Sequence, residues 1–270
     1  DGVLSFEYDT SSFAEVGGLV GLKQWLTKRR EHFLNPQPGV DAPKGVLLLG
    51  VQGGGKSLAA KAVAGMWGVP LLRLDFSALY NKYIGETEKN LRESLAMADT
   101  LSPCVLWLDE IEKALSVDAS DNGTSKRLLG ALLTWMAERK QPVFLVATSN
   151  DISSLPPELV RKGRMDEIFF VDLPTETVRR EIFAIHLRKR FHDPDRLDLD
   201  ALARSCDGFS GAEIEQAVVS GLYRCQAEAV ELDTQHLLEE VACTQPLSVV
   251  MGEKLADLRS WAQGRTVAAD

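Results

Sequence analysis

The sequence of 270 residues has few cysteines and no long apolar run. Its four cysteines, Cys104, Cys206, Cys225 and Cys243, are too scattered for a metal site or a disulfide framework, which favours a reducing compartment. No apolar run approaches the roughly 20 residues of a membrane-spanning helix. Residues 1–10 also lack the charged and apolar segments of a signal peptide. We therefore expect a cytoplasmic protein without a membrane span.

Positive charge is scarce relative to negative charge. Lys and Arg number 30 and Asp and Glu number 39, so the formal net charge is −9. This balance disfavours a nucleic-acid partner and a cationic membrane binder. Basic clusters at residues 28–30 and 188–190 end helical patterns without interleaved aromatic residues, so they indicate solvated helix ends or a site for an acidic partner. Apolar residues make up 45% of the chain, enough to bury a core.

Short apolar runs alternate with helical patterns in the first part of the chain. The runs predict five strands, at residues 45–49, 71–75, 104–108, 143–147 and 168–171. The patterns between them predict helices at residues 57–67, 88–101, 125–140 and 157–160. This alternation is typical of a parallel sheet with helices on both faces, in the α/β class. Only helical patterns follow Pro174, so we predict an α/β domain at residues 1–172 and a helical domain, with a C-terminal helix, at residues 173–270.

A phosphate-binding pattern follows the first predicted strand. Residues 50–57, Gly-Val-Gln-Gly-Gly-Gly-Lys-Ser, fit G-x-x-x-x-G-K-[ST] between a strand and a helix. The glycines let backbone N–H groups surround phosphate oxygens, and the helix presents its positive end to the same anion. We expect Lys56 to contact the β and γ phosphates and the Ser57 hydroxyl to ligate Mg²⁺. The other expected loop contacts are Gln52, Gly53, Gly54, Gly55 and Leu58. The alternative is a glycine-rich turn that binds nothing.

Two adjacent carboxylates follow the third predicted strand. Asp109 is expected to hold Mg²⁺ through water, and Glu110 to orient and deprotonate the attacking water. An adjacent Asp-Glu pair distinguishes hydrolysing motors from small-molecule kinases and Ras-like GTPases. The sequence therefore predicts a nucleoside-triphosphate hydrolase with a P-loop fold. Two solvated carboxylates at the start of a helix are the alternative.

Further segments make the chain resemble the AAA ATPases. Residues 148–150, Thr-Ser-Asn, are similar to the family's sensor segment, which implies that Asn150 positions the lytic water. Residues 155–167 are similar to the family's second region of homology, which contains two arginines three residues apart. The resemblance implies that Arg161 and Arg164 are arginine fingers that contact the γ phosphate bound by a neighbouring subunit. Without this context, two arginines in a loop would indicate a solvated face.

The resemblance extends to the nucleotide base and the lid. Residues 208–214, Gly-Phe-Ser-Gly-Ala-Glu-Ile, resemble the family's lid motif, which implies that Gly211 and Ala212 lie near the nucleotide. His186 aligns with a family histidine beside the ribose and adenine, although a purely structural histidine is the alternative. The fold implied is a five-stranded P-loop domain followed by a small helical lid.

The stretch Glu-Val-Gly-Gly at residues 15–18 matches the family segment whose backbone contacts the adenine edge. The match implies that Val16 and Gly17 contact the base. Main-chain hydrogen bonds there would select ATP over GTP, so ATP and Mg²⁺ are the expected cofactors.

Within the AAA family, the chain resembles the stand-alone bacterial and plastid proteins named for a hypothetical chloroplast reading frame. This likeness is carried by residues 50–53, 102–107, 132–135, 162–170 and 246–248. Members of that group usually have a further N-terminal domain, so we expect the chain to be a fragment that lacks it.

The chain also departs from the usual family pattern. The phosphate loop has no proline and an extra glycine, which makes its ordering on binding more costly in entropy. Residues 135–139, Trp-Met-Ala-Glu-Arg, replace a Met-Asp-Gly stretch that signals between subunits in many family members.

Residues 81–86 are similar to the loop that lines the central pore of AAA rings. The resemblance implies that Tyr83, Ile84 and Gly85 grip an extended polypeptide; packing of Tyr83 within its own subunit or on a partner is the alternative. Self-association into a ring, a homohexamer, and a protein substrate follow from the same resemblance. A second hypothesis is a regulatory switch or assembly scaffold whose ATP state controls partner binding, which the departures at residues 51–55 and 137–138 favour. The acidic balance disfavours a DNA-dependent motor.

Overall fold

The computed structural model of the chain describes residues 3–7, 16–79, 86–115, 123–151, 153–161 and 163–270. The expected pore-loop residues Tyr83, Ile84 and Gly85 lie outside these ranges. None of the helices in the described ranges combines the length and the apolar character that crossing a membrane requires.

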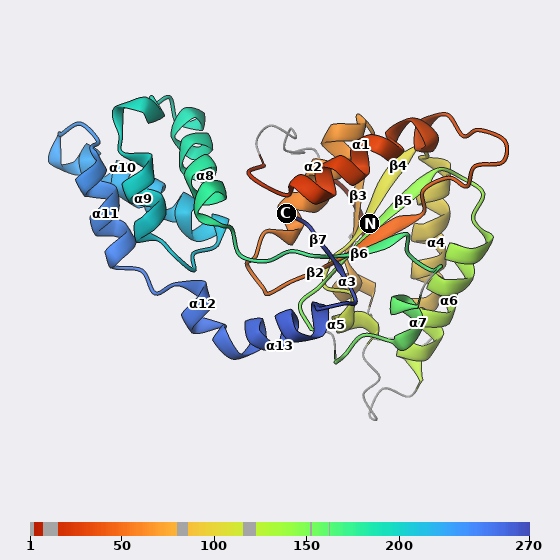
Figure 1. Ribbon diagram of the computed structural model, residues 1–270. Coiled ribbons are helices and arrows are strands. Elements are labelled where there is room, and N and C mark those ends of the chain that lie inside the picture. The colour runs from red at the N-terminus through yellow and green to blue at the C-terminus, as the bar shows by residue number, and fades with distance from the viewer. Residues whose placement is uncertain (1–2, 8–15, 80–85, 116–122, 152, 162) are drawn as a thin grey trace.

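A seven-stranded sheet forms the centre of the molecule, in the order β1-β3-β4-β5-β2-β6-β7 (Figure 1). Its strands are Leu4–Glu7 (β1), Gly45–Leu49 (β2), Leu71–Leu74 (β3), Cys104–Leu108 (β4), Val143–Ser149 (β5), Glu167–Phe170 (β6) and Val267–Ala268 (β7). The five predicted strands are β2 to β6; they are adjacent and parallel, which confirms the predicted fold. The sequence did not predict the two edge strands: β1 pairs antiparallel with β3, and β7 pairs parallel with β6.

Helices cover both faces of this sheet (Figure 1). The helices of this part are Val20–Leu34 (α1), Lys56–Trp67 (α2), Phe76–Leu79 (α3), Glu86–Thr100 (α4), Glu112–Leu115 (α5), Thr124–Glu138 (α6) and Pro157–Val160 (α7). Apolar residues of α1 and α2 pack on one face, and those of α4 and α6 pack on the other. Buried strands covered in this way need apolar residues on both faces, which explains the unbroken apolar runs in the sequence.

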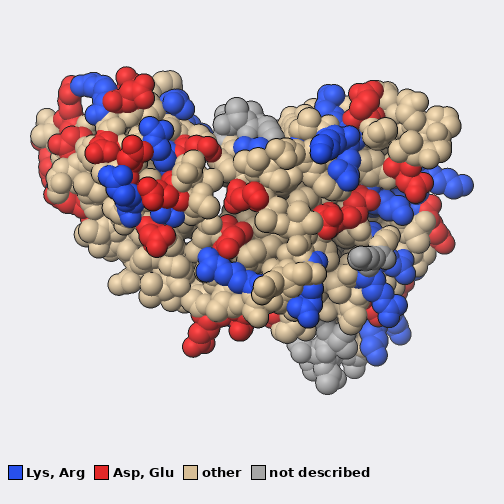
Figure 2. Space-filling view, viewed as in Figure 1, with Lys and Arg blue, Asp and Glu red and all other residues tan. Residues whose placement is uncertain are grey.

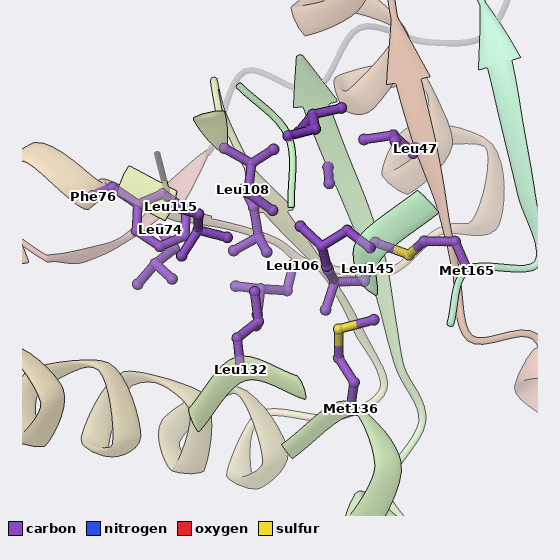
Figure 3. Packing of buried hydrophobic residues seen from close by; sticks show 14 of the residues in the cluster. Leu47, Leu74, Phe76, Leu106, Leu108, Leu115, Leu132, Met136, Leu145 and Met165 are labelled. Atoms are coloured by element: carbon purple, nitrogen blue, oxygen red, sulfur yellow. The ribbon is translucent and has the colours of Figure 1, made fainter. Parts of the chain in front are cut away.

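Strand β2 illustrates the two-sided burial. Leu47 and Leu49 belong to the cluster with α4 and α6, whereas Val46 and Leu48 belong to the cluster with α1 and α2. Figure 3 shows the first cluster, in which leucines of neighbouring strands meet Leu132 and other residues of α6. Because the side chains of a strand alternate between faces, both cores depend on the same register.

A second group of helices follows β6. Its members are Glu176–Lys189 (α8), the short 3₁₀ helix Pro194–Arg196 (η2), Leu199–Ser205 (α9), Gly211–Glu228 (α10) and Thr234–Ala242 (α11). Their buried residues form a hydrophobic cluster of their own, and we call α8 to α11 the helical unit. Figure 1 shows this unit at the left of the view, beside the sheet part.

The chain then returns to the sheet through Leu247–Val250 (α12) and Gly252–Ala262 (α13). Leu255 and Leu258 of α13 lie in the same cluster as Leu47 of the sheet. The sequence had assigned this helix, with all of residues 173–270, to the helical domain. The difference arises because apolar spacing predicts that a helix has a buried face but not which core receives it.

Candidate nucleotide-binding site

The phosphate loop connects β2 to α2. Gly53 and Gly55 have φ angles of 80° and 99°, a left-handed region that residues with a Cβ rarely adopt. Gly54 N–H donates to the Val51 carbonyl at 3.0 Å, which closes the turn. Helix α2 begins directly after Gly55, so its N-terminal N–H groups face the inside of the loop.

The ammonium group of Lys56 lies inside this loop. It donates hydrogen bonds to the carbonyls of Gly50 and Val51, each at 2.7 Å, and only 6% of the residue is exposed. Burial lowers the pKa of Lys56 to about 8, against the opposing effect of the carboxylates of Glu112, Asp109 and Glu110. A partly desolvated cation held by two loop carbonyls is well placed to bind an anion that displaces them.

The strand order explains why Asp109 and Thr148 are neighbours. Strand β5 lies between β4 and β2, and its register pairs Ala147 with Leu108. The Thr148 hydroxyl donates to Asp109 Oδ1 at 2.6 Å and accepts from Glu110 N–H at 3.0 Å. Arg73, at the end of β3, forms an ion pair with the other Asp109 oxygen at 3.2 Å. The sequence did not predict these contacts of Thr148 and Arg73, because their partners follow another strand.

Glu110 is held in a defined orientation beside Asn150. Its φ of 49° is uncommon for a residue with a side chain and marks local backbone strain. Asn150 Nδ2 donates to Glu110 Oε1 at 3.2 Å, and Lys113 forms an ion pair with the other oxygen. The backbone N–H of Asn150 donates to buried Glu112 at 3.0 Å, which anchors the sensor segment. One water molecule could therefore contact Glu110 and Asn150 together.

A cavity of about 470 Å³ lies between the phosphate loop and the helical unit. The structure brings all the residues that the sequence assigned to nucleotide binding, Mg²⁺ binding and water activation to this one cavity. They are Val16, Gly17, Gln52, Gly53, Gly54, Gly55, Lys56, Ser57, Leu58, Asp109, Glu110, Asn150, His186, Gly211 and Ala212. Their individual roles stay predictions. The residues come from segments that are far apart in the sequence, from the loop after β2 to helix α10. Figure 2 shows a notch between the helical unit and the sheet part.

The cavity also has walls that the sequence reading missed. Ile182 and Ile185 of α8 line it together with His186, and their i, i+3, i+4 spacing is a signal that could have been read. Asp172 and Asp270 line it too. No local pattern indicates these two carboxylates, because the path of the chain alone brings them to the cavity.

His186 is largely enclosed at this wall. Arg190 Nη1 lies 3.3 Å from His186 Nδ1, and because a guanidinium only donates, Nδ1 is the acceptor and the proton is on Nε2. Burial lowers the pKa of His186; Glu215, 3.7 Å away, raises it, and Arg190 and Lys189 lower it further. The imidazole is therefore neutral near pH 7 and offers one N–H donor.

Arg161 and Arg164 do not line this cavity. They follow α7, where Arg161 is exposed and Arg164 is half-buried. Within the described ranges, neither side chain forms an ion pair with the same chain. Their role as arginine fingers toward a neighbouring subunit stays a prediction.

Ser57 and Asp109 provide a hydroxyl and a carboxylate at the same cavity. Oxygen donors of this kind suit Mg²⁺, which binds one or two side chains together with phosphate oxygens and water. The residues present therefore fit a magnesium ion that a nucleotide brings with it.

Comparison with known proteins identifies the class. Residues 46–173 match the ATPase family associated with various cellular activities (AAA). This match covers β2 to β6, the strands that carry the phosphate loop, the Asp109–Glu110 pair and the sensor segment. The chain belongs to the AAA family, whose members are nucleotide-binding ATPases.

Individual relatives make the similarity more specific. The chain is 46% identical over 253 residues to an uncharacterized AAA domain-containing protein, ycf46, of Pyropia yezoensis, covering 92% of this chain and 51% of that protein. It is 42% identical over 265 residues to ycf46 of Guillardia theta, covering 96% and 52% respectively. These matches confirm the predicted resemblance to plastid AAA proteins, and the chain spans about half of their length.

The chain is also 40% identical over 192 residues to a proteasome-activating nucleotidase of Aeropyrum pernix, covering 68% of this chain and 46% of that protein.

Proposed function

We propose that this chain binds Mg-ATP, hydrolyses it to ADP and phosphate, and assembles into a homohexameric ring that remodels or threads a protein. The observation that carries the ATPase proposal is the meeting of Lys56, Glu110 and Asn150 at one cavity. These residues are a phosphate-binding cation, a base and a water-positioning amide, which together are the groups that phosphoryl transfer to water requires.

Each group has a separate part in the proposed chemistry. The N–H groups at the start of α2 and the Lys56 ammonium bind the phosphates. Glu110 accepts a proton from the attacking water, and Asn150, which already contacts Glu110, holds the same water in line with the γ phosphate. Bound Mg²⁺, held by Ser57 and Asp109, would neutralise charge on the phosphate oxygens.

The ring proposal is supported by Arg161 and Arg164. They lie outside the cavity of their own chain and form no ion pair within the described ranges, so they are available to a nucleotide bound by a neighbour. A guanidinium supplied from outside stabilises the charge of the transition state. The protein substrate rests on the resemblance of residues 81–86 to a pore loop.

One observation favours the switch or scaffold as a second candidate. In residues 135–139, the Trp135 indole donates to Asp99 at 2.9 Å, and the Arg139 guanidinium lies 4.8 Å from the centre of the Trp135 ring. Residues 135–139 thus form contacts within their own chain, at the position where many family members have residues that signal between subunits. This arrangement supports hydrolysis that is not coordinated between neighbours.

The test uses Glu110→Gln with the exposed Glu253→Gln as a matched control. We expect Glu110→Gln to bind ATP and to release phosphate at least ~100-fold more slowly, the scale of a lost general base. Lys56→Ala should not bind ATP. An unchanged rate in Glu110→Gln would mean that another residue is the base.

Light scattering on Glu110→Gln then separates the two candidates. A change from monomer to a closed ring when Mg-ATP is added supports the ring motor. A monomer at all protein concentrations, with hydrolysis intact in the wild type, contradicts the ring for this chain and favours the switch.

A further inference from the structure

Residues 267–270 bring Asp270 to the nucleotide cavity, although they lie far from the phosphate loop in sequence. Strand β7 pairs with β6 at the sheet edge, and Ala269 N–H donates to the Phe170 carbonyl at 3.0 Å. The Ala269 carbonyl accepts from Leu22 N–H of α1 at 3.0 Å, and Ala269 is fully buried. These contacts fix the backbone just before Asp270, whose side chain lines the cavity.

The Asp270 carboxylate holds the segment of residues 16–19, which carries the expected adenine-contacting residues. Leu19 N–H donates to Asp270 Oδ1 at 2.5 Å. On the preceding residue, Gly18 N–H donates to Glu181 Oε2 of α8 at 3.2 Å. Lys23 Nζ donates to the Val16 carbonyl at 2.7 Å. The segment is therefore fixed by groups from three places: Asp270, Glu181 of the helical unit and Lys23 of α1.

The backbone of this segment needs such support. Gly18 and Leu19 both have left-handed φ angles, 69° and 55°, a conformation that is disfavoured for leucine. A Cβ at Gly18 would lie 2.7 Å from Asp270 Oδ1, so only glycine allows the carboxylate to approach this closely. Burial raises the pKa of Asp270, and the Leu19 hydrogen bond acts in the opposite direction. An enclosed carboxylate therefore stabilises a strained turn.

The hydrogen bonds that hold residues 16–19 do not involve the backbone groups of Gly17. Within the described ranges, the N–H and the carbonyl of Gly17 have no hydrogen-bond partner, and Gly17 lines the cavity. An N–H donor beside a carbonyl acceptor matches the adenine edge, which offers the N1 acceptor and the N6 amino donor. Guanine presents the opposite groups, an N1–H donor and the O6 acceptor, so the same peptide rejects it.

We propose that Asp270 is a positioning residue that gives the site its selectivity for adenine over guanine, by holding Leu19 and thereby the orientation of the Gly17 peptide. The inference rests on the proposed function, because it assumes that the cavity binds ATP. The proposal adds the carboxylate of Asp270, which follows β7, to a site formed by the phosphate loop and the helical unit.

The experiment compares the affinities of wild type, Asp270→Ala and Asp270→Asn for Mg-ATP, Mg-GTP and Mg-tripolyphosphate by calorimetry. Asp257→Ala, an exposed carboxylate of α13, is the matched control. In Asp270→Ala we expect ATP affinity to fall about tenfold, the scale of one lost hydrogen bond, with GTP and tripolyphosphate affinities unchanged. Asp270→Asn keeps an oxygen acceptor for Leu19 N–H, so its ATP-to-GTP ratio should stay near that of the wild type.

The outcomes are distinguishable. Loss of the ATP-to-GTP ratio in Asp270→Ala, with its recovery in Asp270→Asn, supports the proposal, since a structural role alone would change all three ligands together. If Asp270→Ala binds ATP and GTP with equally reduced affinity, or with unchanged affinity, the proposal is overturned. Equal binding of ATP and GTP by the wild type overturns the selectivity while leaving the proposed ATPase intact. No ATP binding by the wild type overturns both.

Discussion

At the scale of single residues, the hydroxyl of Thr148 connects the two carboxylates of the site. It donates to Asp109 and accepts from the backbone of Glu110, and the residue is fully buried. Asp109 and Glu110 thus have their orientations set by one atom of a neighbouring strand. Arg73 and Lys113 restrain the same carboxylates from outside the nucleotide cavity.

Thr148→Val should lower both stability and hydrolysis. Valine keeps the shape but leaves Asp109 Oδ1 and the Glu110 N–H without a partner, which costs about 1–3 kcal/mol in the free energy of unfolding. The same loss of alignment should lower the rate of phosphate release roughly tenfold or more, at 1.4 kcal/mol per tenfold. Urea unfolding and a phosphate-release assay at saturating ATP measure the two effects. Thr134→Val, at an exposed position of α6, is the control; equal behaviour of the two variants would contradict the bridging role.

His186 predicts a specific dependence of stability on pH. Burial lowers its pKa in the folded protein, so its neutral form contributes stability that is present above the unfolded value, about 6.5. That contribution is lost as the pH falls below about 6.5 and through the lower pKa of the folded state. Between pH 7.5 and 5, wild type should therefore lose more unfolding free energy than His186→Asn. His192→Asn, away from the cavity, should follow wild type, and parallel curves for all three proteins would contradict the prediction.

Sequence reasoning found the residues of the site whose neighbours are local in sequence. The phosphate loop and the Asp-Glu pair are recognisable because their chemistry is contained in eight and two consecutive residues. Thr148, Glu181 and Asp270 were missed for the opposite reason. Their partners lie 38 to 251 positions away, and only the folded chain brings them together.

At the scale of elements, two glycines with different surroundings test the packing of the α/β part. Gly130 lies in the exposed face of α6, where an added Cβ meets nothing within 4 Å. Gly45, at the start of β2, is different because a Cβ there would lie 2.5 Å from the Leu145 carbonyl oxygen.

Gly130→Ala should therefore stabilise the protein by up to about 1 kcal/mol, the difference in helix propensity between the two residues. Gly45→Ala should destabilise it by roughly 1–3 kcal/mol, because a buried strand has no room for the extra carbon. Chemical unfolding of both variants measures the difference. If the two substitutions change the free energy of unfolding in the same direction, the surroundings of the two positions are not as described.

Secondary structure was predictable where the apolar pattern was long or sharply bounded. Strands β2 and β4 match their predicted bounds, and α6 extends over nearly all of its predicted range. The edge strands β1 and β7 were missed because four and two residues, largely exposed, give no alternation to recognise. Helix α13 was found, but its packing against the sheet cluster depends on the return of the chain, which no local pattern encodes.

At the scale of the whole molecule, the charges agree with the composition. On the face in Figure 2, outside the grey residues, Lys and Arg are interspersed with Asp and Glu rather than gathered into a broad basic patch. This mixture is unlike the positively charged groove of nucleic-acid binding proteins.

The path of the chain also limits how its parts can move. The helical unit leaves the sheet after β6 and comes back through α13 to β7, which pairs with β6 itself. Arg259 of α13 binds Asp172, just after β6, through both carboxylate oxygens at 2.8–3.1 Å, so the exit and the return are joined side by side. A body held by one linker can rotate about three axes, whereas a body held at two points turns about the line between them. The two connections of the helical unit therefore restrain its rotation relative to the sheet more than a single linker would.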